Sequence, residues 1–195
     1  MIQDLLNNSY NNSYNPKAEP SDNSLIVYFY NNELLCHTKG NIKSLENAIP
    51  GKAGSEEIFW SLPTFKEISD NIGISPNNLI YLFKMKIYDR EQDFFLLTGD
   101  KLFEKTLLDY GYLKSEKYYT NDNSGKTEDE KFYYLPALKF RSLKPLNISF
   151  AVITAWQLYT WYRDNKYCGR CRQKTVLDNK ERMVKCPNCG NMIYP

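Results

Sequence analysis

Four cysteines near the C-terminal end are spaced to bind a single metal ion. They form two Cys-x-x-Cys pairs, Cys168 with Cys171 and Cys186 with Cys189, and fourteen residues separate the pairs. This spacing is typical of a zinc ribbon, in which each pair lies on a tight turn and four thiolates surround Zn²⁺ as a tetrahedron. Because four protein ligands leave no open coordination position, we expect the zinc to be structural and not to activate water.

The residues beside the pairs favour tight turns, with one exception. Pro187 and Gly190 suit the second turn, since proline presets φ and glycine tolerates positive φ. In the first turn Arg172 takes the glycine position, so we expect strained or altered backbone there. Two disulfides are a poorer interpretation, because no signal peptide indicates an oxidising compartment. A redox-active Cys-x-x-Cys is poorer still, because no strand-then-helix pattern surrounds the pairs.

Basic residues lie close to the cysteines in the sequence. A Zn(Cys)4 centre carries a formal 2− charge, which these side chains can offset; binding of nucleic acid is the alternative role. The residues are Lys166, Arg170, Arg172, Lys174 and Lys185.

The segments around the cysteines resemble those of a known family. Ala155-Trp156-Gln157-Leu158-Tyr159 and Trp161-Tyr162-Arg163 lead into the first pair, and Ile193-Tyr194-Pro195 follows the second. This order resembles the NADH pyrophosphatases, or NAD(+) diphosphatases, of the Nudix hydrolase superfamily, closely over residues 141–195 and more loosely over 1–140. The resemblance implies a degenerate Nudix-like N-terminal domain, a helix, a zinc ribbon and then a catalytic Nudix domain.

The catalytic motif of that family is missing from the 195 residues. A Nudix box needs Gly-x5-Glu-x7-Arg-Glu and a Glu-Glu pair, whose carboxylates hold magnesium at a pyrophosphate. Arg90-Glu91 is the one Arg-Glu dipeptide, and Leu82 stands where the upstream glutamate belongs. We therefore expect the front part of such an enzyme, inactive alone, with the Mg²⁺ or Mn²⁺ site in an absent catalytic domain.

The resemblance also implies a function for the whole enzyme, which would hydrolyse NAD(H) to NMN(H) and AMP. This portion would contribute structure, dimerisation and part of the substrate pocket, and NAD-capped RNA is a further substrate to consider. Three residues correspond to substrate contacts of the family, namely Tyr194, Glu181 and Arg141. A tyrosine can stack on a base and an arginine can pair with phosphate; ribbon packing, a solvated hairpin charge and a surface residue are the alternatives.

A function of another class also fits the sequence, namely a stand-alone zinc-ribbon module that binds RNA or a protein partner. The composition favours neither a polyanion partner nor a membrane, since the net charge is +2 and no run of eighteen apolar residues occurs. Without a leader sequence, we expect the cytoplasm, where reduced thiols can bind metal.

The pattern as a whole predicts an α+β protein with a mostly antiparallel N-terminal sheet and a few helices. We expect an arm over 1–24, a Nudix-like domain over 25–145, a connecting helix over 146–165 and the ribbon over 166–195. Within these, strands are expected over 25–30, 33–37, 79–88, 94–97, 132–135 and 138–140, with turns at 31–32 and 89–93 and loops over 38–57 and 121–131. Helices are expected over 64–71, 100–110 and 150–163.

Two further features of the pattern make specific predictions. Thr64 and Glu67 form a capping-box pattern, and the last helix has an apolar face at helical spacing, capped by Asn147 or Ser149. This face can serve simple core packing; alternatively, it attaches the ribbon to the first domain and lines a dimer interface. Its residues are Phe150, Val152, Ile153, Trp156, Tyr159 and Trp161.

Cys36 and His37 are the one unpaired thiol and the one histidine. They could form a catalytic dyad. Adjacent residues on a strand point to opposite faces, however, so we expect one buried and one exposed side chain.

Overall fold

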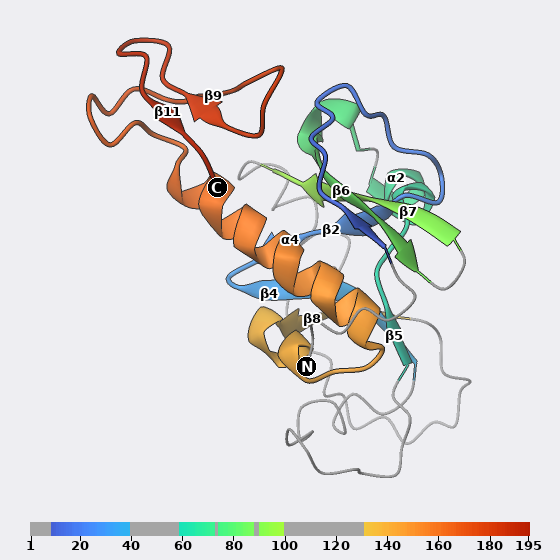
Figure 1. Ribbon diagram of the computed structural model, residues 1–195. Helices are drawn as coiled ribbons and strands as arrows, with labels where there is room; N and C mark the ends of the chain where they lie inside the picture. Colours follow the sequence, from blue (N-terminus) through green and yellow to red (C-terminus); the bar gives the residue numbers. More distant parts are fainter. Residues whose placement is uncertain (1–8, 40–58, 73, 88–89, 100–130) are drawn as a thin grey trace.

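The computed structural model describes residues 9–39, 59–72, 74–87, 90–99 and 131–195. Over these residues the fold is α+β, as the sequence predicts (Figure 1). Two four-stranded sheets lie between a long helix, α4 (Leu146–Asp164), and a short one, α2 (Phe65–Ile72), and a three-stranded zinc ribbon follows α4.

The first sheet has the strand order β1-β6-β7-β2. Its neighbours are antiparallel except for β2 and β7, which run parallel. Its strands are β1 (Tyr10–Asn11), β6 (Leu79–Ile87), β7 (Arg90–Leu97) and β2 (Leu25–Val27). The N-terminal arm therefore lies on the domain over residues 9–24, where β1 extends the sheet beyond β6.

The second sheet is organised around β4, which pairs antiparallel with its three neighbours. β3 and β5 follow one another along one side of β4, and β8 pairs with its other side. The strands are β3 (Phe29–Tyr30), β4 (Glu33–Lys39), β5 (Phe59–Ser61) and β8 (Lys131–Pro136).

The single strand expected over 25–30 is instead two strands that belong to different sheets. β2 ends at Val27 beside β7, and β3 begins at Phe29 beside β4. The chain crosses between sheets at Tyr28, whose carbonyl accepts from the Leu35 N–H at 3.0 Å. The expected hairpin turn follows, because Asn31 and Asn32 have φ of 47° and 66°, which fits a two-residue type I′ turn.

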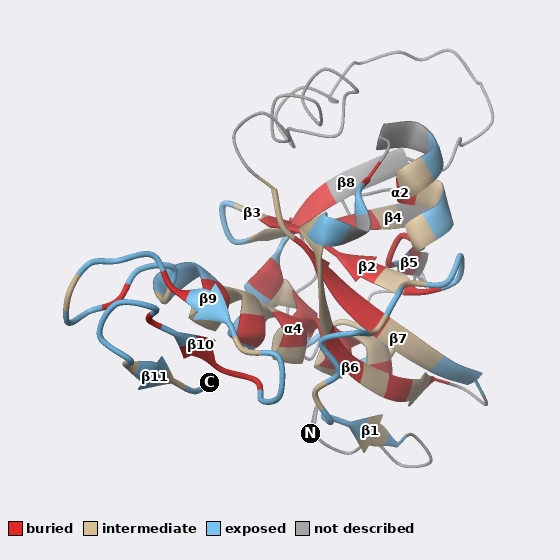
Figure 2. Ribbon diagram, turned by 90° about the horizontal axis from the view of Figure 1, so that it is seen from above, coloured by how far each residue is buried: buried red, intermediate tan, exposed pale blue. Residues whose placement is uncertain are grey.

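Alternation along the strands places apolar side chains on both faces of the sheets. Val27, Leu34 and Phe94 pack in the core beneath α4, whereas their sequence neighbours pack in the core beneath α2. These neighbours are Ile26, Leu35 and Phe95. The sheets are therefore buried between two helices, and Figure 2 shows the red buried stretches of these strands.

Helix α2 confirms the capping-box prediction. The Thr64 N–H donates to Glu67 Oε2 at 2.7 Å, and the Glu67 N–H donates to Thr64 Oγ1 at 3.3 Å. The reciprocal pair satisfies two N–H groups that the first helical turn leaves without partners.

Two local predictions are wrong. Residues 90–93 belong to β7 and not to a turn, since β6 and β7 pair as far as Ile87 and Arg90. Residues 138–140 lie in a 3-10 helix, η2 (Ala137–Arg141), and not in a strand. Pro136, which has no N–H, ends β8 on an edge of the sheet, and the following Ala137 N–H donates to Asn32 O at 2.9 Å.

Helix α4 fills the connecting segment expected over 146–165, beginning four residues before the helix predicted over 150–163, and its caps differ from the prediction. Pro145 occupies the N-cap position, where no side chain caps the helix. Asn147 accepts from the Ile148 N–H at 2.9 Å, and Ser149 donates to Leu143 O at 2.8 Å. Both predicted cap residues therefore lie within the helix, where their side chains form hydrogen bonds with nearby backbone groups.

The buried face of α4 agrees with the prediction at Val152, and the other five predicted residues pack against the core but are only partly buried. Trp156, Tyr159 and Trp161 are only partly buried. The buried stripe at helical spacing consists of Ala151, Val152, Ala155, Leu158 and Tyr162, and its three fully buried members, Ala151, Val152 and Ala155, are small. Alanines allow the helix axis to approach the sheets closely, so the large aromatic side chains lie at the edges of the contact.

Cys36 and His37 do not form a dyad. Cys36 is fully buried beneath α4, and burial raises the pKa of its thiol. His37 points to the other face, where Nε2 lies 3.5 Å from Glu67 Oε1. The two side chains thus point to opposite faces, as expected. Cys36 is buried, but the His37 side chain is only 13% exposed and is therefore not the exposed residue that we expected.

Some expectations fall outside the described residues: the helix over 100–110, the loop over 121–130, and nearly all of the loop over 38–57. Residues 38 and 39 extend β4. Among the described helices, none is both long enough and apolar enough to cross a membrane.

We expect Thr64→Ala to lower the free energy of unfolding by about 1 kcal/mol, because it removes the capping hydroxyl from α2. Urea unfolding followed by circular dichroism measures the change. Thr64→Ser keeps the hydroxyl and should retain most of the stability; equal losses in both variants would show that the cap is not the cause.

Candidate metal centre and ribbon surface

Two turns of matching geometry present the four cysteines. In the first, the Arg172 N–H donates to Cys168 O at 2.8 Å; in the second, the Gly190 N–H donates to Cys186 O at 3.0 Å. Arg172 has a φ of 62° and Gly190 a φ of 70°. The predicted strain is therefore present, because an arginine adopts the left-handed conformation that glycine takes in the sister turn.

The four sulfur atoms gather at one point. All of them lie within 4.8 Å of one another, with separations of 3.5 Å for Cys168–Cys189, 3.3 Å for Cys171–Cys186 and 3.6 Å for Cys171–Cys189. A tetrahedron with zinc–sulfur bonds of about 2.3 Å has edges of about 3.8 Å. The cysteines therefore fit one structural Zn²⁺, and none of the five thiols in the chain forms a disulfide.

Backbone N–H groups stabilise the thiolate form of the first pair. A hydrogen bond from the Gln173 N–H, helped by Asn188 and Cys186, lowers the pKa of Cys171 to about 6. A backbone hydrogen bond from Cys171 likewise lowers the pKa of Cys168. Since metal binding needs deprotonated cysteines, the first turn favours metal binding by Cys168 and Cys171. In the second turn the hydrogen bond from the Asn191 N–H lowers the pKa of Cys189, but hydrogen bonds with the other cysteine sulfurs outweigh it and raise that pKa to about 12.

The ribbon sheet presents two different faces. Its strands are β9 (Val176–Leu177), β10 (Val184–Lys185) and β11 (Met192–Ile193), in the order β11-β10-β9. Directly paired residues share a face. Leu177, Val184 and Ile193 form the inner row, of which Val184 is buried in the core beneath α4, and Val176, Lys185 and Met192 form the outer row.

Arg182 attaches the ribbon to the N-terminal domain, and sequence reasoning missed it. The side chain is buried, donates from Nη2 to the carbonyl of Leu82, and lies 5.3 Å from the centre of the Tyr14 ring. Leu82 occupies a β-bulge between β6 and β7, so its backbone has no partner residue on β7. Beside it, burial raises the pKa of Tyr162 to about 12, and Arg182 opposes that shift.

The N-terminal arm completes this attachment. The Tyr14 hydroxyl donates to Asp178 O at 2.9 Å, which ties the arm to the β9–β10 turn of the ribbon. The Asp178 carboxylate accepts from the N–H groups of Lys180 and Glu181 at 2.7 and 3.0 Å, and these bonds lower its pKa. The turn that carries Glu181 is therefore held from both sides.

Two of the three predicted substrate contacts lie together. The Tyr194 hydroxyl donates to Glu181 Oε2 at 2.9 Å on the exposed surface of the ribbon, and this bond raises the pKa of Tyr194. The Tyr194 side chain is 53% exposed, so its ring is accessible.

Arg141 lies elsewhere. It is exposed on η2, before the first turn of α4, whereas the ribbon follows the last turn. The 19 residues of α4 span about 28 Å at 1.5 Å per residue. Within one chain, Arg141 is therefore remote from the pair of Tyr194 and Glu181.

We expect Cys186→Ser to lose most of the bound zinc, because three thiolates and a hydroxyl make a weaker site. Elemental analysis of the unmodified protein should find about one zinc per chain. Cys36→Ser is the matched control and should keep its zinc. A chelator should unfold the ribbon before the N-terminal domain, since zinc binding and ribbon folding are coupled. Full zinc occupancy in Cys186→Ser would contradict the assignment.

Comparison with known proteins supports this description of the ribbon. Residues 163–194 match the NADH pyrophosphatase zinc ribbon domain. Proteins from two strains of Pseudomonas aeruginosa, each named NAD-capped RNA hydrolase NudC, are 39% identical to this chain over 41 residues. That match covers 21% of this chain and 15% of each relative. The C-terminal segment is thus a zinc ribbon of the NADH pyrophosphatase type.

Proposed function

We propose that this chain is the N-terminal and zinc-ribbon part of an enzyme that hydrolyses NAD(H) to NMN(H) and AMP. In this proposal it contributes structure, dimerisation and part of the substrate pocket. The carboxylates that hold Mg²⁺ or Mn²⁺ belong to a catalytic Nudix domain outside the 195 residues. The observation that carries the proposal is the hydrogen bond between Tyr194 and Glu181 on a ribbon of the NADH pyrophosphatase type.

This pair has the chemistry to hold one end of a dinucleotide. The exposed Tyr194 ring offers a flat surface on which a base can stack. Glu181 orients the phenol through Oε2, and its other oxygen can accept from a substrate hydroxyl. Arg141 could pair with a phosphate of the same ligand only across a homodimer, because α4 separates it from this pair within one chain.

The outer row of the ribbon supports the proposed homodimer. Val176 and Met192 are 51% and 55% exposed and lie on the same face, on either side of Lys185. Paired apolar side chains on a small sheet are a natural contact for a second subunit. We place the protein in the cytoplasm, where reduced thiols can bind metal.

Binding of RNA by the ribbon is the second candidate function. Residues 163–194 contain eight Lys or Arg residues and three Asp or Glu residues, so the segment is basic. The relatives' name, NAD-capped RNA hydrolase, connects the two candidates, since an RNA with an NAD cap presents both chemistries. In the native gene, a Gly-x5-Glu-x7-Arg-Glu box within about forty codons after Pro195 would favour the enzyme. A stop codon there would favour the binding module.

We expect Tyr194→Ala in the full-length protein to lower kcat/KM for NADH by about 10- to 100-fold. The reason is that a lost stacking contact is worth about 1–3 kcal/mol. Tyr194→Phe keeps the ring and should lose less. Tyr167→Ala, which removes another exposed ribbon tyrosine, should leave kcat/KM unchanged and serves as the matched control. If Tyr194→Ala destabilises the ribbon while kcat/KM is preserved, Tyr194 is a packing residue.

We also expect the 195-residue chain alone to release no AMP from NADH with Mg²⁺ or Mn²⁺, because its sequence lacks the Nudix box whose carboxylates would hold these ions. Chromatographic detection of AMP measures this. AMP release that scales with protein concentration and disappears on mutating a residue of this chain would contradict the proposal.

A further inference from the structure

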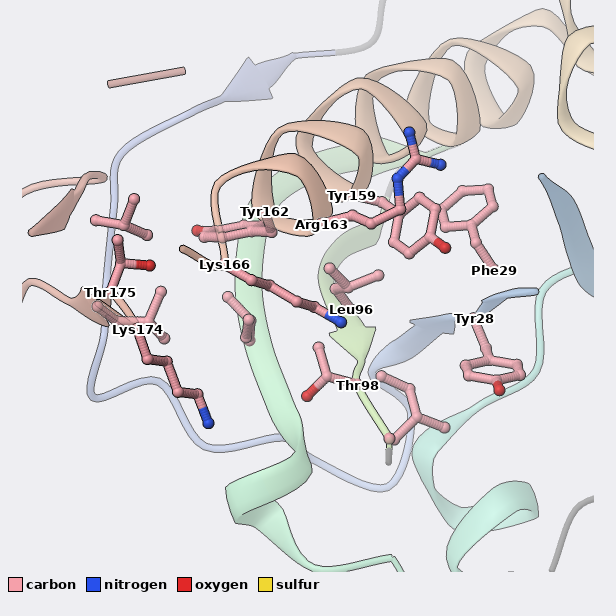
Figure 3. Close-up of a pocket in the computed structure, with 15 residues that line it drawn as sticks. Tyr28, Phe29, Leu96, Thr98, Tyr159, Tyr162, Arg163, Lys166, Lys174 and Thr175 are labelled. Carbon is pink, nitrogen blue, oxygen red and sulfur yellow. The ribbon is translucent and has the colours of Figure 1, made fainter. Parts of the chain in front are cut away.

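A cavity of about 220 Å³ lies where the N-terminal sheets, the end of α4 and the ribbon meet (Figure 3). The two sheets contribute Phe29 and Leu96 to its lining. Tyr159 comes from the last turns of α4, Lys166 from the segment after the helix, and Lys174 from the ribbon. Leu177 and Val184 of the inner row of the ribbon also line it. Neither Tyr194 nor Glu181 lines it.

Aromatic rings form much of its wall. Tyr159 stacks on Phe29 with ring centroids 5.0 Å apart and an interplanar angle of 28°. Tyr28 and Tyr162 also line the cavity but are only 4% and 8% exposed, so the protein covers most of each ring. The remaining aromatic surface, mainly that of the partly buried Tyr159, can contact the edge of a planar heterocycle.

The polar part of the cavity is cationic. Arg163, Lys166 and Lys174 line it, and no described lining residue is acidic. Arg163 is already engaged, since Nε donates to Asp164 Oδ1 at 2.8 Å and the guanidinium lies 5.5 Å from the centre of the Tyr159 ring.

The two lysines are available to a ligand. Within the described part of the chain, neither Lys166 nor Lys174 forms an ion pair with a carboxylate. Figure 3 shows the Lys166 side chain extending across the cavity toward Thr98, while Lys174 approaches from the ribbon. Uncompensated ammonium groups beside an apolar wall attract an anion that carries a flat apolar body.

We propose that this cavity binds a nucleoside monophosphate. The base lies against the aromatic wall, and the phosphate accepts hydrogen bonds from the ammonium groups of Lys166 and Lys174. The volume of about 220 Å³ is too small to enclose a dinucleotide, since typical ligand pockets begin at roughly 300 Å³. The site is separate from the ribbon surface of the proposed function and does not depend on it.

Isothermal titration calorimetry of the zinc-loaded chain with AMP tests this proposal. We expect saturable binding of one AMP per chain, and weaker binding of adenosine and of inorganic phosphate, which each supply half of the contacts. Lys166→Gln and Lys174→Gln should each weaken AMP binding about tenfold, because each removes a charge-assisted hydrogen bond.

Matched variants separate this site from others. Lys180→Gln removes an exposed ribbon lysine that does not line the cavity and should bind AMP normally, and Lys174→Arg should retain binding. Zinc content and melting temperature report whether each variant folds. Absence of saturable AMP binding by the folded protein would overturn the proposal. So would AMP binding that survives both glutamine variants but is lost in Tyr194→Ala; that result would leave the proposed function intact.

Discussion

The docking of the ribbon onto the bulge at Leu82 is the interaction on which the rest of the structure depends. A buried guanidinium is costly unless its N–H groups find acceptors, and Arg182 finds one in the Leu82 carbonyl. The same side chain lies over the Tyr14 ring, whose hydroxyl holds the ribbon turn. This contact sets how the ribbon sits on the domain, and thereby forms the cavity and places Tyr194.

Helix α4 can serve both parts of the molecule because its central buried residues are small. Ala151 and Ala155 let it pack closely on the N-terminal sheets, and the core that they enter continues to Val184 of the ribbon. Helix and ribbon are therefore parts of the same hydrophobic core as the sheets. The larger side chains of α4, such as Tyr159, remain at the edge, where they are available to line the cavity.

Local patterns in the sequence predicted the features that depend on neighbouring residues. The cysteine pairs, the left-handed Arg172, the Asn31-Asn32 turn and the capping box of Thr64 all follow from residue type and short spacing. Features that depend on distant contacts were missed. Arg182 and Leu82 are 100 residues apart, and Tyr14 and Asp178 are 164 apart, so no local pattern distinguishes these residues from surface ones.

The same reasoning explains why the most buried residues of α4 are mostly not the predicted ones and why residues 25–30 form two strands instead of one. An apolar aromatic residue is a strong sequence signal for burial, but close helix packing favours alanine. A continuous apolar run predicts a strand, but two cores on opposite faces allow it to leave one sheet and enter another at Tyr28. Both cases were decided by how the elements pack on each other.

Charge links the metal centre to the two proposed ligand sites. The ribbon segment carries an excess of five positive charges, which the formal 2− of a four-thiolate zinc centre reduces to three. Basic side chains close to the cysteines can offset the negative charge of that centre. The ammonium groups of Lys166 and Lys174 at the cavity form no ion pair with a carboxylate among the described residues. The ribbon has more basic side chains than are needed to neutralise its zinc centre. Its remaining positive charge favours ligands that carry phosphate. This excess is a physical reason to look for nucleotides at both the cavity and the surface of Tyr194.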